Sequence, residues 1–201
     1  GTFPPMKTIQ KQLTSYLRRA NGKMAETLTA LVRIPTVNPY SGDLNPAGEA
    51  AGQEFLARHL RRLGGKVSFL PVPRHAYRRA GILGPRDRDW TNRRNLIARF
   101  RFGRGPRPAW ILLNAHMDTI GVSDFEGDPF SGRRRGDLIA GRGSSDCKGG
   151  LVAALFAIRA LRDCKAPINA EVILESVVDE ECSGSGAGTI AACLAGITAD
   201  Y

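Results

Sequence analysis

The chain has 201 residues, 42% of them hydrophobic, which suits one sizeable globular domain and excludes a mainly disordered protein. Its net charge of +10 comes from scattered basic pairs and the triplet Arg133-Arg134-Arg135, without interleaved aromatics or a nucleic-acid-binding motif. We therefore expect no nucleic-acid partner; the alternative use of the charge is to attract anionic substrates such as acyl amino acids. No apolar run approaches the roughly 20 residues of a membrane span, so no membrane insertion is expected.

The N-terminal residues and the cysteines bear on targeting and on the redox state of the thiols. Residues Gly1–Pro5 have neither the apolar region of a signal peptide nor a helical or strand pattern, so we expect a short leader outside the fold. The four cysteines show no CxxC spacing, which predicts reduced thiols and a cytoplasmic protein.

Helical periodicity dominates the N-terminal third. Apolar residues recur at helical spacing over 9–17 and again over 24–32, and Asn21-Gly22 predicts a break between two helices. The loop 34–39, which contains two prolines, ends the second helix. A third helix is predicted over 49–63, with a glycine pair as its stop.

Strands dominate the remainder of the chain. The arginine- and glycine-rich stretch 74–94 is predicted to be an exposed loop, and 149–161 to be a helix. Alternation of strands and helices predicts an α/β fold, a three-layer sandwich with a mostly parallel central sheet flanked by helices. Short apolar runs predict the strands of that sheet over 66–72, 95–100, 110–114 and 170–178.

Polar side chains with catalytic potential follow the ends of these elements. His116 and Asp118 come just after one buried strand, and Asp179-Glu180-Glu181 just after another. Asp146 precedes the 149–161 helix. Because ligands bind outside the carboxyl ends of strands in such sheets, we expect all three groups at one edge.

The residue types at this edge favour a metal site. Three adjacent acids repel one another unless a cation neutralises them, although a solvated acidic turn is the alternative. His116 and Asp118 would point the same way in an extended chain, which gives a metal-binding imidazole a carboxylate partner. The glycine-rich segment around Asp146 does not match a phosphate-binding loop, because Lys148 precedes its glycine pair.

Taken in order, these segments resemble the co-catalytic zinc metallopeptidase family of acetylornithine deacetylase, succinyl-diaminopimelate desuccinylase and aminoacylase. The resemblance implies a zinc exopeptidase-like fold, of which 6–201 would be the N-terminal portion of the catalytic domain. It covers nearly the whole chain and is carried by 34–39, 116–119, 128–130, 141–150 and 179–181.

The resemblance implies a role for each site residue. His116 would bind one zinc ion and Glu181 the second, while Asp146 would bridge both and be followed by a cis peptide bond. Asp118 would orient His116. Glu180 would be the general base and acid that takes a proton from metal-bound water and gives it to the leaving amine. The implied activity is hydrolysis of an amide bond in N-acyl amino acids or small peptides with two Zn²⁺, for which Co²⁺ can substitute.

The sequence departs from the family pattern after Glu181. Members have a further acidic ligand, a lid or dimerisation domain through which a homodimer would form, and a late histidine; Asp200 comes too early for that ligand. Asp179 would be a supporting acid, and Cys147 stands where methionine is usual. The chain is then either part of a longer hydrolase or a native product with an incomplete site. We expect weak or no hydrolysis by the isolated chain, and the alternative function is an inactive homologue that serves as a binding or assembly module.

Overall fold

The computed structural model describes residues 6–43, 46–85, 87–182 and 186–201, so the expected leader Gly1–Pro5 lies outside the described residues. The elements in chain order are α1 (Met6–Val32), α2 (Ala50–Arg62), β1 (Lys66–Pro71), α3 (Ala76–Arg79), β2 (Arg94–Phe102), β3 (Ala109–His116), β4 (Arg134–Arg135), β5 (Leu138–Ile139), α4 (Lys148–Asp163), β6 (Ala170–Val177) and α5 (Ala187–Leu194).

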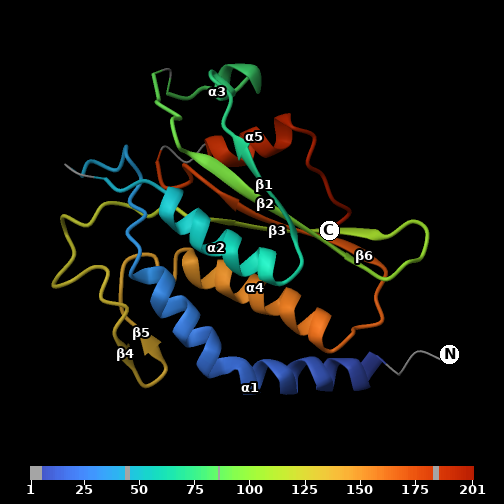
Figure 1. Ribbon diagram of the computed structural model, residues 1–201. Coiled ribbons are helices and arrows are strands. Elements are labelled where there is room, and N and C mark those ends of the chain that lie inside the picture. Colours follow the sequence, from blue (N-terminus) through green and yellow to red (C-terminus); the bar gives the residue numbers. More distant parts are fainter. Residues whose placement is uncertain (1–5, 44–45, 86, 183–185) are drawn as a thin grey trace.

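A four-stranded sheet in the order β1-β2-β6-β3 lies between helices on both of its faces (Figure 1). Helices α2 and α4 cover one face, and α1 packs on the outer side of α4. Helix α5 lies on the other face, and α3 packs against α5. This confirms the predicted α/β class with helices flanking a central sheet.

The prediction of a mostly parallel sheet is wrong for the described strands. The β1–β2 and β2–β6 pairs are antiparallel, and the β3–β6 pair is parallel. Parallel neighbours need a crossover connection, usually a helix. Here α4 supplies such a crossover between β3 and β6, whereas β1 and β2 are joined by a segment whose helix, α3, has four residues. The sheet is therefore mixed.

The core lies between the sheet and the α2–α4 layer. Helix α4 buries Leu151, Leu155 and Ile158, which recur at the helical spacing that brings side chains onto one face. Strand β6 is buried along nearly its whole length, because it lies inside the sheet with helices on both sides. This burial explains its continuous apolar sequence.

Two N-terminal predictions need correction. The first is the break at Asn21-Gly22, which lies inside the continuous 27-residue helix α1. A single glycine costs a helix only about 1 kcal/mol relative to alanine, and the packing of α1 on α4 outweighs that cost. The second is the exposed loop 74–94, most of which is exposed as predicted, but which contains the short helix α3 with buried Ala76 and Tyr77. Among the described residues, no helix combines the length and apolar character needed to cross a membrane.

The register of β3 and β6 brings their carboxyl ends together. His116, the last residue of β3, lies opposite Val177, the last residue of β6. Beyond β3 the chain pairs with a different segment, since the main chain of Thr119 bonds to both Thr36 and Asn38. The loop after α1 is thereby attached to the edge at which both strands end.

Candidate metal site

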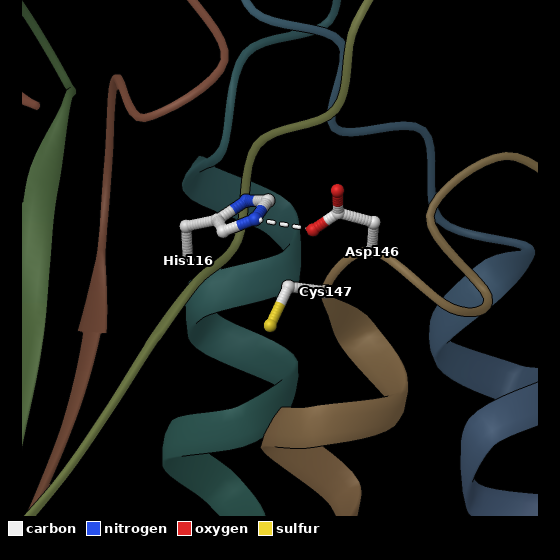
Figure 2. A group of neighbouring side chains, drawn as sticks. All are labelled: His116, Asp146 and Cys147. Atoms are coloured by element: carbon white, nitrogen blue, oxygen red, sulfur yellow. Dashed lines mark hydrogen bonds and ion pairs between the residues drawn. The ribbon is translucent and has the colours of Figure 1, made fainter. Parts of the chain in front are cut away.

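His116 and Asp146 form the centre of the site (Figure 2). The Nε2 atom of His116 lies 2.8 Å from Oδ1 of Asp146. His116 is nearly buried at the end of β3, whereas the Asp146 side chain is 76% exposed just before α4. The Asp146–Cys147 peptide bond is cis, as the resemblance implied. The pair thus has one buried member and one that solvent can reach.

The two ring nitrogens of His116 have different partners. Nδ1 lies 2.9 Å from the main-chain oxygen of Asp118, which can only accept, so Nδ1 carries a proton. Nε2 then faces Asp146 either with a second proton or with a lone pair for a metal ion. Burial lowers the pKa of His116, but the negative charges of Asp118 and Asp146 outweigh burial and raise it overall. The same negative surroundings favour a bound cation.

Glu180 lies at the same site. Its Oε2 atom is 3.8 Å from His116 Nε2, and its side chain is about half exposed. Imidazole nitrogen and carboxylate oxygen are the donors from which zinc sites without cysteine are built. The donor set therefore fits a zinc ion, with His116 and Asp146 as the nearest pair.

Cys147 belongs to the cluster by distance, since its sulfur and the donor atoms of His116 and Asp146 lie within 4.8 Å of one another. Figure 2 shows the sulfur pointing away from the other two side chains. Burial raises the pKa of the Cys147 thiol, which works against the thiolate that a metal would need. Cys147 is thus a neighbour of the site, and we expect no metal bond to its sulfur.

Asp118 is fully buried and has a wider function than the sequence indicated. Its main-chain oxygen, rather than its carboxylate, accepts the hydrogen bond from His116. The carboxylate instead accepts the main-chain N–H groups of Glu180 at 3.2 Å and Glu181 at 3.0 Å. Asp118 therefore joins the end of β3 to the acidic segment after β6.

Glu181 comes to the site through this main-chain bond. Burial raises the pKa of its carboxyl group, His116 acts in the opposite direction, and the negative charge of Asp146 raises it further. Glu181, His116 and Asp146 therefore influence one another electrostatically. By contrast, Asp200 accepts the N–H of Trp110 at 2.9 Å, at the opposite end of β3 from His116. The metal-binding roles of His116, Asp146 and Glu181 stay predictions.

Sequence reasoning missed a buried polar network behind the site. Arg93 looked like one half of a surface pair, but it is 4% exposed and bonds Glu49 through both Nε and Nη2. Burial opposes its charge, yet Glu49 and Asp179 beside it raise its pKa. Asn38 was assigned only to an ordered loop, and it bonds the carboxylate of Asp118 at 2.7 Å. No local pattern reveals these partners, which lie far apart in the chain.

Lys148 gives a pH-dependent prediction. It is fully buried, its Nζ donates to the main-chain oxygen of Ile34 at 2.8 Å, and burial lowers its pKa from 10.5 to about 8. Between these values the unfolded chain binds more protons than the folded chain, so stability rises with pH. Metal-free protein should gain up to about 3 kcal/mol of unfolding free energy from pH 8 to pH 10.5 through this group.

Urea unfolding at several pH values measures the effect. Lys148→Met should flatten the rise, while other groups that titrate in this range cancel in the comparison of the two proteins. An identical pH dependence of both proteins would contradict the assignment.

Residues 112–201 match the model of Peptidase family M20/M25/M40. An N-formyl-4-amino-5-aminomethyl-2-methylpyrimidine deformylase of Halalkalibacterium halodurans is 27% identical over 197 residues, which cover 96% of this chain and 40% of the relative. Acetylornithine deacetylase of Photorhabdus laumondii is 27% identical over 170 residues, which cover 83% of this chain and 38% of the relative.

The fold also has a solved counterpart. The crystal structure of human carnosine dipeptidase 1 matches with a TM-score of 0.62 and 22% identity, over 86% of this chain and 35% of that chain. This likeness concerns the fold. In each of these comparisons the chain spans less than half the length of the relative.

Proposed function

We propose that this chain, whose residues 112–201 match the model of peptidase family M20/M25/M40, forms part of the catalytic domain of a metal-dependent amide hydrolase. The substrates proposed are N-acyl amino acids or small peptides. One observation carries the proposal: His116 Nε2 faces Asp146 at 2.8 Å and Glu180 at 3.8 Å, at the edge where β3 and β6 end. This arrangement supports the division into metal-binding and proton-transferring groups.

The residues would divide the reaction as follows. His116, Asp146 and Glu181 would hold two zinc ions, which would polarise a scissile carbonyl and lower the pKa of metal-bound water. Glu180 accepts a proton from the attacking water and delivers it to the leaving amine. Its half-exposed carboxylate is suited to this because both water and substrate can reach it. The net charge of +10 favours approach of an anionic substrate.

The leaving acyl group distinguishes the members of this substrate class. The two curated relatives differ here, since one is a deformylase and the other a deacetylase. We therefore propose an N-acyl substrate without assigning its acyl group, and dipeptides complete the set to be tested.

The test has a binding step and an activity step. The visible absorption of bound Co²⁺ measures metal binding to the 201-residue chain. N-formyl, N-acetyl and N-succinyl amino acids and dipeptides are then assayed as substrates, both with this chain and with the protein encoded by the complete reading frame that contains it. We expect metal binding and hydrolysis of at least one substrate class, and we expect EDTA to abolish that hydrolysis. Metal binding without hydrolysis by either protein would favour a non-catalytic binding module. The absence of both metal binding and hydrolysis would contradict the proposal outright.

A further inference from the structure

We propose that Asp179 is a positioning residue, which fixes the main chain of Glu180 and Glu181 so that their carboxylates face the site. This inference rests on the proposed function of those two glutamates. Asp179 itself is fully buried, and the hydrogen-bond partners of its carboxylate are residues behind the site, so it acts through its neighbours.

The main-chain conformation of Asp179 is unusual, and four hydrogen bonds to its carboxylate hold the residue in place. Its φ angle is +65°, a left-handed conformation that few residues other than glycine adopt, although aspartate and asparagine tolerate it best. Such a conformation persists only where the surroundings determine it. The carboxylate accepts hydrogen bonds from Arg88 Nη1 at 2.6 Å, Tyr77 Oη at 2.8 Å, Arg93 Nη2 at 3.2 Å and Asn38 Nδ2 at 3.3 Å.

A second buried carboxylate holds the next two residues. Asp118 accepts the main-chain N–H groups of Glu180 and Glu181. Asn38 joins the two carboxylates, because its Nδ2 atom donates to Oδ2 of Asp118 at 2.7 Å and to Oδ1 of Asp179 at 3.3 Å. The three consecutive acids are thus anchored at each residue: the first by its side chain and the other two by their main chain.

The positive charges of Arg88 and Arg93 explain how the buried carboxylates of Asp179 and Glu49 can lie close together. Arg88 and Arg93 both bond Asp179, and Arg93 also bonds the buried Glu49. Buried charge networks are seldom the most stable way to fill a core, and apolar residues of similar volume often do as well or better. They do impose one geometry on the groups that they bind. Here that geometry belongs to the segment that contains the proposed proton-transfer and ligand carboxylates.

Hydrogen exchange of the Glu180 and Glu181 amides, followed by NMR in the metal-free chain, tests the inference. Asp179→Asn keeps the side-chain shape and tolerates the left-handed conformation but removes the charge. We expect both amides to exchange on the order of tenfold faster or more, since their anchor is loosened locally, while amides within β6 keep their rates. Co²⁺ affinity, measured where the variant is fully folded, should fall by about tenfold.

Glu175→Gln is the matched control. Glu175 is also buried, lies in β6, and bonds Asn114 at 2.9 Å. Its replacement removes a buried carboxylate from the strand that leads into the acidic segment, and exchange at Glu180 and Glu181 should stay unchanged. If Asp179→Asn does not fold, Tyr77→Phe removes one donor to Asp179 and keeps all the charges, and a smaller acceleration at the same two amides is expected.

Unchanged exchange at Glu180 and Glu181 in the folded variant, or uniform acceleration throughout the chain, would overturn the inference. The exchange measurement uses neither metal nor substrate. A wild-type chain that binds no cobalt and hydrolyses nothing would therefore contradict the proposed function, while local acceleration in Asp179→Asn would still establish that Asp179 positions this segment.

Discussion

Replacing Asp146 by alanine should weaken Zn²⁺ or Co²⁺ binding by at least about 100-fold, because loss of even a supporting residue around a metal typically costs 10- to 100-fold. The side chain is 76% exposed and has His116 as its hydrogen-bond partner in the site, so the fold should persist. Isothermal titration of the two proteins measures the difference, and their thermal unfolding in EDTA verifies the fold.

Asp124→Ala is the matched control for that experiment. Asp124 is equally exposed and pairs with Arg142 at 2.9 Å. Its replacement should leave the metal affinity unchanged. Equal affinities of the Asp146→Ala and wild-type proteins would contradict a bridging role for Asp146.

Glu180→Gln should lower the turnover number by roughly 10² to 10⁴-fold, the range typical for loss of a general base or acid. The amide keeps the size of the side chain but cannot take a proton from water. Metal affinity should change little, because the proposed ligands are retained. Steady-state kinetics on the substrate that the protein hydrolyses provides the measurement.

Glu126→Gln, at an exposed glutamate before the β4–β5 hairpin, is the control for that substitution and should retain full turnover. A Glu180→Gln protein with unchanged turnover would exclude Glu180 as the proton-transfer group. A protein that loses metal and turnover together would instead assign Glu180 to metal binding.

The convergence of the site residues could be predicted because it depends on local signals. Buried strands are visible as apolar runs, and polar residues directly after them lie at the strands' carboxyl ends. His116 and Glu180 meet in this way, with the register of β3 and β6 bringing their segments side by side. The direction of the other strands could not be predicted, because it depends on which strands pair and not on the sequence of any one strand.

The network behind the site was hidden for a different reason. The partner of Arg93 is Glu49, which lies 44 residues away in the chain and at the start of α2. Each is an ordinary charged residue in its own sequence context, and only the packing of α2 against β2 makes them a buried pair. The eight-residue helix α5 and the two-residue strands β4 and β5 likewise escaped notice, since two turns of helix or two residues of strand have too little periodicity to be recognised.

X-ray anomalous scattering at the zinc edge, from crystals of the chain grown with Zn²⁺, tests the metal site most directly. We predict zinc within about 2.0–2.2 Å of His116 Nε2 and of an Asp146 carboxylate oxygen, in place of their present hydrogen bond. Zinc bound elsewhere, with His116 and Asp146 still joined to each other, would contradict the account.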